Sequence, residues 1–323
     1  MTDRNIMSER GWPKIAVVGA GAVGGYFGGL LARAGARVVM IGRPAFVEAV
    51  SRRGLSLDTL QFQESVRVEA SSKLEAARDA DIVLFCVKTT DTAPTARGLA
   101  PWLAPAALVV SCQNGVDNVA QIRAVSGIEA LPSVVYVAAS TPEPGRVKHL
   151  GRGDLVVGPR NERTERLAAV FARARVACTI SENVEGELWT KLLWNCALNA
   201  ASALGRATYG QIAASADART LVVRVVDEVL AVADASRIRL AGVDGAQAAY
   251  AGVWTLVSQM ADTRSSTAQD LNRGKRTEID SLNGFIARRG AELGVPTPVN
   301  QALYALVKLA EDHSWAGDPR KAS

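Results

Sequence analysis

The amino-acid sequence predicts an α/β fold, with a parallel sheet in its N-terminal half and an all-helical C-terminal domain. Two observations lead to this prediction. Short β-branched runs alternate with helical stretches up to about residue 182, which is typical of a parallel sheet covered by helices on both faces. Beyond that point strand-like runs stop and long helical periods follow. We therefore divide the 323 residues into a flexible N-terminal tail (1–13), a first domain (14–182) and a helical domain (183–323).

The first domain opens with a strand, a glycine-rich turn and a helix. Apolar β-branched runs predict the strands, and the stretches between them predict helices. The predicted strands are 15–18, 37–41, 82–87, 108–112 and 133–138, and the predicted helices are 23–34 and 95–103. Pro142, Pro144 and Gly145 then precede a hairpin-like pair of strands, 146–150 and 154–157, and a helix from about residue 162.

The second domain is predicted to contain long helices separated by short turns. Its apolar residues recur at helical spacing in five segments, 187–203, 219–237, 247–260, 277–293 and 298–311. Gly205, Gly210, Gly242 and Gly245 are placed as interhelical turn residues.

Composition excludes several classes of protein. With 48% hydrophobic and 21% charged residues, the chain is neither disordered nor fibrous. The net charge of +5 is small and the arginines are scattered, whereas nucleic-acid binding calls for clustered basic residues. No run of 18 uncharged apolar residues is present, so no membrane segment is expected.

The cysteines and histidines carry no metal-binding pattern. The four cysteines lack C-x-x-C spacing, which favours buried free thiols in a reducing, cytoplasmic compartment. No His/Cys/Asp cluster has ligand spacing, so no metal site is expected.

The sequence carries no signal for oligomeric state, and a homodimer is compatible with it.

A G-x-G-x-x-G turn lies between the first predicted strand and the first predicted helix. Gly19 allows the tight turn, Gly21 lets a pyrophosphate approach the backbone, and Gly24 lets the helix pack on the strand. The helix N-terminus adds unpaired N–H groups and a positive dipole end. This context favours a Rossmann-type dinucleotide site over a turn that is glycine-rich for packing alone. Its residues are Gly19, Ala20, Gly21, Ala22, Val23 and Gly24.

The end of the second strand indicates which dinucleotide is bound. An acidic residue about 20 positions past the glycines would hold the ribose hydroxyl of NAD. Arg43 lies there instead, with no Asp or Glu beside it, and a guanidinium would bind the 2′-phosphate of NADP(H). NADP (NADPH) is therefore the predicted cofactor. The alternative is that Arg43 only ends a strand on the surface.

Two further polar residues follow predicted strands. Lys88 comes after strand 82–87, and Asn114 comes after strand 108–112. Because ligands of open α/β sheets bind at the carboxyl ends of the strands, Gly19, Arg43, Lys88 and Asn114 are expected to face one cleft. Each could alternatively be a solvated loop residue.

A polar stripe on an apolar helix carries the strongest chemical signal. Glu187, Lys191, Asn195 and Asn199 are spaced four apart among Leu, Trp, Cys and Ala, so they share one helix face. One interpretation is an amphipathic helix whose polar face is exposed to solvent. The sharper one places the stripe at the mouth of the nucleotide cleft, with Lys191 as proton donor and the two asparagines as hydrogen-bond partners of a polar substrate.

The scarcity of histidine supports a lysine as the acid. Reduction of a ketone by NADPH needs a hydride and a proton from a general acid, which is most often histidine. His149 and His313 are the chain's two histidines, and neither has a convergent setting. A lysine whose pKa is brought toward neutrality by burial can do the same work.

With these pieces placed, the sequence resembles the ketopantoate reductase (2-dehydropantoate 2-reductase) family from about residue 14 to 308. The matching motifs are the glycine turn, Gln113-Asn114-Gly115, the lysine helix over 187–199, and the T-E-I-D-x-x-N-G run over 277–284. The resemblance implies an N-terminal Rossmann domain, a helical C-terminal domain, and NADPH-dependent reduction of ketopantoate, a 2-keto acid, to pantoate for pantothenate and coenzyme A synthesis.

The resemblance also implies roles for single residues. Lys191 corresponds to the proton donor, Glu278 to a residue between nicotinamide and substrate hydroxyl, and Asn114 to a contact of both cofactor and substrate. The remaining correspondences are Asn195, Asn199 and Ser266 as substrate contacts, and Arg43 and Lys88 as cofactor contacts. From spacing alone, Ser266 and Glu278 read only as helix-start residues.

One departure from the family pattern concerns the loop after the lysine helix. It carries Thr208 and Tyr209 where some relatives place a smaller polar substrate-binding residue.

Two alternatives to ketopantoate reduction stay open. One is a related NADP-dependent reductase of another 2-keto or 3-hydroxy acid, and the other is a non-catalytic NADP(H)-sensing Rossmann protein.

Overall fold

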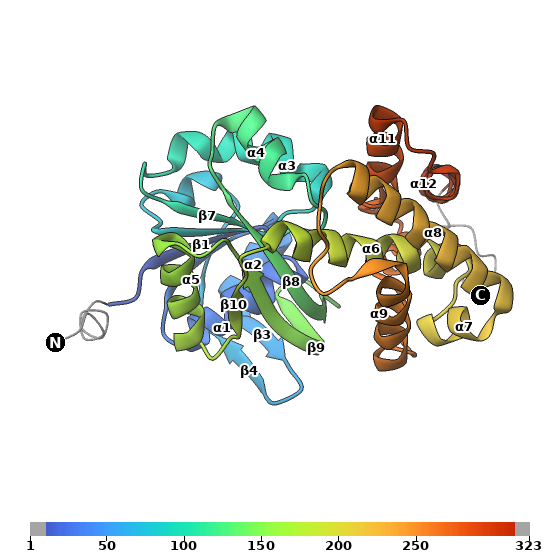
Figure 1. Ribbon diagram of the computed structural model, residues 1–323. Coiled ribbons are helices and arrows are strands. Elements are labelled where there is room, and N and C mark those ends of the chain that lie inside the picture. Colours follow the sequence, from blue (N-terminus) through green and yellow to red (C-terminus); the bar gives the residue numbers. More distant parts are fainter. Residues whose placement is uncertain (1–10, 314–323) are drawn as a thin grey trace, which may run out of the picture. The chain divides into compact units, whose positions relative to one another are not determined.

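The computed structural model describes residues 11–313, and the chain divides into two compact units (Figure 1). The first comprises Met1–Val184 and the second Glu185–Ser323. The first is an α/β unit, while the described part of the second contains helices and no strand. The predicted fold class is therefore confirmed.

A ten-stranded sheet forms the centre of the first unit, in the order β4-β3-β9-β8-β7-β6-β1-β2-β5, with β10 beside β9. The pairings β2–β1–β6–β7–β8 are parallel, and β8 and β9 are antiparallel. The strands are β1 (Lys14–Val18), β2 (Arg37–Ile41), β3 (Leu55–Asp58), β4 (Gln63–Val66), β5 (Glu69–Ser71), β6 (Ile82–Phe85), β7 (Leu108–Ser111), β8 (Leu131–Ser140), β9 (Arg146–Val157) and β10 (Cys178–Ile180).

Helices cover both faces of this sheet, as Figure 1 shows for α3 and α4 on one side and α1 and α5 on the other. Alternate residues of a strand point to opposite faces. Accordingly, Ile15 and Val17 of β1 pack in one core with α1 (Ala22–Arg33), α2 (Pro44–Arg53) and α5 (Glu162–Arg173). Ala16 and Val18 pack in the other core with α3 (Thr92–Leu99) and α4 (Asn118–Ser126).

The predicted hairpin within residues 146–157 is wrong. These residues form the single strand β9, which pairs with β8. The glycines of Gly151-Arg152-Gly153 resemble a turn in the sequence. In the structure, Gly153 has φ +143° and lies between the pairs Tyr136–Asp154 and Val137–Arg152, where the register shifts. The extra residue is therefore accommodated as a β-bulge and the chain does not reverse.

The beginning of the chain is partly described. Residues 1–10 of the predicted tail lie outside the described residues. Trp12, near its end, is half-buried and packs against the core of the first unit. The Arg173 guanidinium lies 3.8 Å from the centre of its ring, in a cation–π contact.

The second unit is built from seven helices in its described part. They are α6 (Val184–Leu204), α7 (Tyr209–Ala214), α8 (Ala216–Ala235), α9 (Gly245–Gln259), α10 (Ser266–Asn272), α11 (Asn283–Leu293) and α12 (Pro298–Asp312). Gly210 lies inside α7, although the sequence predicted a turn there. None of the described helices has the length and apolarity needed to cross a membrane.

The predicted helix over 277–293 is also wrong in its first part. Helix α11 begins only at Asn283, after a turn that contains the short 3₁₀ helix η5 (Ile279–Ser281). The Thr277 hydroxyl accepts a hydrogen bond from the Ile279 N–H at 3.2 Å. Such a local bond from a side chain to the backbone competes with helix formation. Glu311 also binds the N–H and the hydroxyl of Thr277, and this tertiary contact holds the turn in place.

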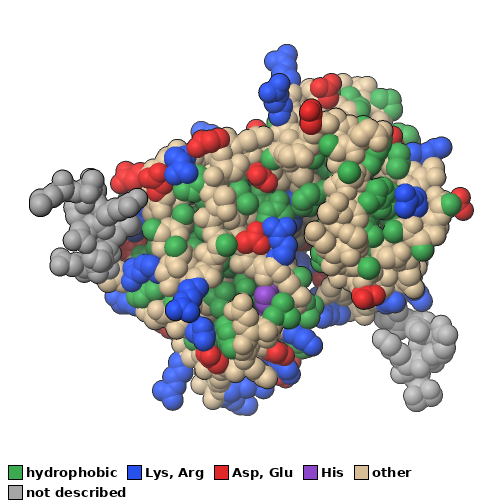
Figure 2. Space-filling model, turned by 60° about the horizontal axis from the view of Figure 1, so that its bottom comes forward, with side chains coloured by type: hydrophobic (Ala, Val, Ile, Leu, Met, Phe, Trp, Pro, Cys, Tyr) green, Lys and Arg blue, Asp and Glu red, His purple; other side chains and the backbone are tan. Residues whose placement is uncertain are grey.

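Charged side chains are distributed over the surface. On the face in Figure 2, lysines and arginines are interspersed with acidic side chains. Among residues 11–313, no group of three or more His, Cys, Asp or Glu side chains is placed to hold a metal ion.

Candidate active site

The glycine turn crosses the carboxyl ends of the central strands. The N–H groups of Gly19 and Ala20 donate to the Ile41 carbonyl at 2.9 and 3.2 Å, which ties the turn to the end of β2. Gly19 has φ +101°, in the left-handed region. A Cβ at this position would lie 2.6 Å from the carbonyl carbon of Cys86. Neither the backbone conformation nor the available space therefore allows a side chain here.

The other two motif glycines differ in what surrounds them. A Cβ on Gly24 would overlap the Gly19 carbonyl oxygen and lie 2.9 Å from Val17 Cγ1. A Cβ on Gly21 would meet no atom within 4 Å. The packing of the protein therefore requires glycine at 24 but not at 21, where the space is open to a ligand.

The start of α1 fits an anion. Its N-cap, Gly21, makes no side-chain hydrogen bond, and no acidic residue lies in the first turn. By contrast, α5 is capped by the Asn161 side chain and carries Glu162 and Glu165 in its first turn. Uncapped N–H groups with the positive end of the helix dipole bind phosphate groups. Together with the open space at Gly21, this arrangement fits the pyrophosphate of a dinucleotide.

Arg43 follows β2 and directly precedes α2. Pro44 begins that helix, and the Arg43 carbonyl accepts from the Phe46 N–H at 2.9 Å. The side chain of Arg43 is exposed, and within residues 11–313 it forms no hydrogen bond or ion pair. The guanidinium is thus available to a ligand at the carboxyl end of β2.

A buried glutamine joins the loops that follow β6 and β7. Gln113 Nε2 donates to the Val87 carbonyl at 3.1 Å and to Thr92 Oγ1 at 2.7 Å. Its Oε1 accepts from Ser111 Oγ at 3.0 Å. Lys88 comes directly after Val87, and Asn114 directly after Gln113, so this side chain fixes the spacing of the two loops that carry them.

Asn114 is held from a second side. Asn118 Nδ2 donates to the Asn114 carbonyl, and Asn118 is itself 3% exposed. Sequence reasoning assigned no role to Gln113 or Asn118. For Gln113 the available signal was a polar residue just after an apolar strand, since a buried amide must find partners. Asn118 begins α4, and its sequence position carries no such signal.

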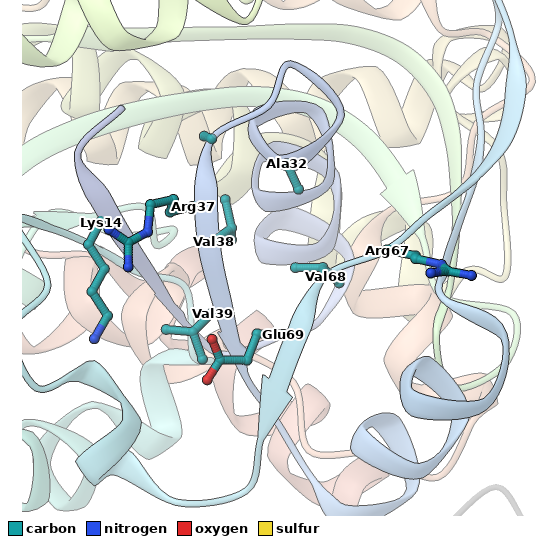
Figure 3. A pocket seen from close by; sticks show the side chains of 9 residues that line it. Lys14, Ala32, Arg37, Val38, Val39, Arg67, Val68 and Glu69 are labelled. Atoms are coloured by element: carbon teal, nitrogen blue, oxygen red, sulfur yellow. The ribbon is translucent and has the colours of Figure 1, made fainter. Parts of the chain in front are cut away.

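The residues predicted to bind the cofactor share one end of the sheet, except Glu278, which lies in the second unit. The glycine turn, Arg43, Lys88 and Asn114 follow β1, β2, β6 and β7, which are neighbouring parallel strands. A cavity of about 280 Å³ lies elsewhere, near the amino ends of β1, β2 and β5 (Figure 3). Its lining includes Lys14, Arg37 and Glu69 and none of the predicted site residues.

In the second unit, α6 carries the predicted catalytic stripe. Lys191 and Asn195 are half-buried, and Asn199 is only 4% exposed. The interpretation of a fully solvated face therefore does not hold at Asn199. The opposite side of the helix is apolar, with Leu193 and Ala200 fully buried.

The thiol on this helix is not a nucleophile. Burial raises the pKa of Cys196 well above its usual range. A buried neutral thiol is inert, because the thiolate is the reactive form.

Asn199 connects α6 to the region of Ser266. Ser265 Oγ donates to the Asn199 carbonyl at 3.0 Å and accepts from the Ala268 N–H at 3.1 Å, so Ser265 is the N-cap of α10. Ser266, the first residue of α10, is exposed and is not the cap. The structure thus brings Asn199 close to the helix start that bears Ser266.

The T-E-I-D turn is fixed on α12. The backbone N–H and the hydroxyl of Thr277 both donate to Glu311 Oε1, at 2.7 and 2.6 Å. Asp280 accepts from the Tyr304 hydroxyl at 2.9 Å and from Lys308 Nζ at 3.1 Å. Glu278, between these two anchors, is half-buried. The flanking residues of the motif are therefore structural, and they hold the backbone of Glu278 in place.

Asn283 links this motif to the lysine helix. Its Nδ2 donates to the Cys196 carbonyl at 3.1 Å and to Asn300 Oδ1 at 3.0 Å. Asn300 Nδ2 in turn donates to Glu228 Oε2 at 2.7 Å. This buried chain joins α6, α11, α12 and α8. The relative placement of Glu278 and the polar stripe is therefore set within one compact helical unit.

The glycine turn lies at the carboxyl end of a parallel sheet, and a separate helical unit with a polar stripe follows it. This combination is typical of a Rossmann-type dinucleotide-binding protein. Residues 15–162 match the family model described as Ketopantoate reductase PanE/ApbA, and residues 183–311 match its C-terminal counterpart. The chain belongs to the ketopantoate reductase family.

Individual relatives agree with this assignment. A 2-dehydropantoate 2-reductase of Pyrococcus horikoshii is 32% identical over 305 residues, covering 92% of this chain and 97% of that protein. A crystal structure of a PanE/ApbA family ketopantoate reductase from Ralstonia eutropha JMP134 is 47% identical, with a TM-score of 0.89 over 93% of this chain and 99% of that one. The comparisons support an oxidoreductase that acts on a small molecule.

The fold is shared more widely. D-mandelate dehydrogenase in a ternary structure with NADH and anilino(oxo)acetate is 23% identical and has a TM-score of 0.85, covering 93% of this chain and 99% of that one. This likeness concerns the fold. Membership of the reductase family, and not this likeness, indicates a nicotinamide dinucleotide cofactor.

Proposed function

We propose that the protein is an NADPH-dependent reductase that converts 2-dehydropantoate (ketopantoate) to pantoate, a step of pantothenate and coenzyme A synthesis. The observation that supports this most is the stripe of Lys191, Asn195 and Asn199 on a helix that is otherwise apolar on its buried side. A cofactor-sensing protein needs no proton donor aligned with two amides. The stripe therefore weighs against the non-catalytic alternative.

The first domain (14–182) has the role of binding NADPH, and the second (183–323) that of binding substrate and supplying the acid. When bound, the nicotinamide supplies a hydride to the keto carbon. Lys191 Nζ donates a proton to the keto oxygen as negative charge develops there, and the neutral amine regains its proton from solvent. Asn195, Asn199 and Ser266 orient the 2-keto acid.

The remaining assigned residues hold the cofactor. The N–H groups of the turn from Gly19 to Gly24 bind the pyrophosphate. Arg43 binds the 2′-phosphate and Lys88 binds the nucleotide. Asn114 contacts cofactor and substrate together, and Glu278 lies at the junction of nicotinamide and substrate hydroxyl. The fixed backbones of Asn114 and Glu278 suit these roles, because positioning within a fraction of an ångström supports catalysis.

The reaction is tested by following NADPH oxidation with ketopantoate and a panel of other 2-keto acids. We expect the highest kcat/KM with ketopantoate. A clear preference for another acid would indicate the related-reductase alternative. If NADPH binds but none of the acids is reduced, the protein is a sensor and the proposal is wrong.

Cofactor choice is tested by Arg43→Ala. Because the Arg43 side chain is exposed, its contact with the 2′-phosphate is worth about 1 kcal/mol, and we expect KM for NADPH to rise about fivefold to tenfold. KM for NADH should stay unchanged, because NADH lacks that phosphate. Arg37→Ala, at the opposite end of the same strand, is the matched control. Equal weakening of both cofactors would show that Arg43 does not bind the 2′-phosphate.

A further inference from the structure

The C-terminal part of α6 and the starts of α7 and α10 form one hydrogen-bonded cluster within the second unit. Ser202 Oγ accepts from the Ser265 N–H at 3.1 Å, and Ser265 Oγ donates to the Asn199 carbonyl at 3.0 Å. The Tyr209 N–H donates to the Thr263 carbonyl at 3.0 Å. These backbone anchors fix where the side chain of Tyr209 lies relative to Asn199.

Tyr209 and Asn199 are joined directly. The Tyr209 hydroxyl donates to Asn199 Oδ1 at 3.2 Å, and the two residues are 8% and 4% exposed. A tyrosine hydroxyl carries its proton at neutral pH and can donate it in a hydrogen bond. Burial raises the pKa of Tyr209 further, to about 12. The side chain of the neighbouring residue Thr208 is occupied differently, because it caps α7 together with Gln211.

The bond determines which group Asn199 can offer to a ligand. A carboxamide turned by 180° exchanges its oxygen acceptor for its two N–H donors. With Oδ1 bound by Tyr209, the acceptor side of Asn199 is engaged. Within residues 11–313, Asn199 Nδ2 donates to no other group. The amide is therefore held as a hydrogen-bond donor.

Asn199 lies far from the proposed acid along the helix. Lys191 and Asn199 are eight positions apart on α6, which corresponds to about 12 Å at 1.5 Å per residue. A substrate whose keto oxygen contacts Lys191 can therefore reach Asn199 only with its opposite end.

We propose that Tyr209 is a positioning residue that determines substrate specificity. By holding the Asn199 carboxamide as a donor, it selects 2-keto acids that carry an acceptor oxygen, such as a hydroxyl, at the end remote from the keto group. This inference rests on the proposed 2-keto acid reductase function. Tyr209 acts through Asn199 and takes no part in the proton transfer.

The experiment compares Tyr209→Phe with the unaltered enzyme on two substrates, ketopantoate and its analogue without the hydroxyl, 3,3-dimethyl-2-oxobutanoate. We expect kcat/KM for ketopantoate to fall about tenfold, the worth of roughly one hydrogen bond. The value for the analogue should change by less than about twofold, since it has no hydroxyl for Asn199 to bind. The preference for the hydroxylated acid should therefore largely disappear, with KM for NADPH unchanged.

Two further variants sharpen the test. Tyr250→Phe removes another phenol hydroxyl, one that donates to Asp227 in the same unit, and should change neither substrate's kcat/KM. Asn199→Asp keeps the acceptor for Tyr209 but removes the N–H donors, and should reproduce the loss of preference.

Three outcomes would overturn the inference. An equal loss of kcat/KM on both substrates in Tyr209→Phe would mean a structural role only, and an unchanged preference would mean that Tyr209 does not set it. If the unaltered enzyme reduces neither acid, the proposed function itself is wrong. This result differs from the first two, in which the unaltered enzyme is active and only the inference about Tyr209 fails.

Discussion

Replacing Lys191 by alanine should lower kcat by about 10² or more while NADPH still binds. General acid catalysis contributes about 10²–10⁴ to a rate, and among the polar residues of the α6 stripe only the lysine carries a proton that it can transfer readily. The asparagines at 195 and 199 can orient a substrate, but a carboxamide is not an acid at neutral pH. The loss should therefore appear in the chemical step.

The kinetic pattern makes this expectation specific. Proton transfer to the developing alkoxide occurs only in the transition state, so kcat and kcat/KM should fall by similar factors. The dissociation constant of NADPH, measured by fluorescence titration, should stay unchanged. A small primary amine added to Lys191→Ala should restore part of the lost rate, since it can supply the missing proton.

A matched control is Lys73→Ala. Lys73 has a side chain that is 75% exposed and forms a 3.5 Å ion pair with Glu75 on the surface of the first unit. Its removal should leave kcat unchanged. An unaltered kcat in Lys191→Ala itself would exclude the lysine as proton donor.

The features that could be predicted from the sequence are those determined by local pattern. The strand, glycine turn and helix around Gly19 follow from the spacing of apolar residues and from the steric needs of one tight turn. The stripe on α6 follows from the four-residue period alone. In both places, residues that are close in the sequence are also close in space. The local sequence is therefore enough to predict the structure there.

The features that escaped prediction depend on partners far away in the chain. The segment around Gly153 reads as a turn until β8 provides the strand against which it bulges. The residues from Thr277 onward read as a helix until Glu311, 34 positions later, binds both the N–H and the hydroxyl of Thr277. Local propensity was overruled in each case by a tertiary contact.

The candidate site shows the same division. Asn199 could be selected from its helix face, but its hydrogen bond to Tyr209 depends on how α7 docks on the loop at residues 261–263. Likewise, the part played by Gln113 becomes visible only when the loops after β6 and β7 lie side by side. The sequence pattern identified the candidate side chains. The three-dimensional packing showed which of these side chains are fixed by hydrogen bonds and which residues form those bonds.

Alanine at Gly21 and alanine at Gly24 should have opposite consequences, although both positions belong to one motif. At Gly24, alanine would gain about 1 kcal/mol of helix propensity. Its Cβ would however overlap the Gly19 carbonyl oxygen and press on Val17 Cγ1 at 2.9 Å. Overpacking costs about 1–3 kcal/mol, and more where the obstructing atom belongs to the backbone and cannot turn away. We therefore expect a lower free energy of unfolding and a Tm reduced by about 2–4 °C per kcal/mol.

At Gly21, alanine should leave the fold intact and weaken the binding of the cofactor. The position has φ −84°, which alanine adopts without strain, and its Cβ would meet no protein atom within 4 Å. If the open space is where the pyrophosphate approaches the backbone, the added methyl group costs about 1–3 kcal/mol of binding, or about 10-fold to 10²-fold in the Kd of NADPH. The Tm of the ligand-free protein should stay close to that of the unaltered enzyme.

The comparison of the two variants distinguishes the two meanings of a glycine-rich turn. A thermal unfolding curve without ligand reports packing, and an NADPH titration of the folded protein reports the site. If Gly21→Ala kept full affinity for NADPH, the turn would be glycine-rich for packing alone and the anion site at the start of α1 would lose its main support. If it lost affinity with an unchanged Tm, glycine at 21 would be required by the ligand, because the protein itself leaves room for a side chain there.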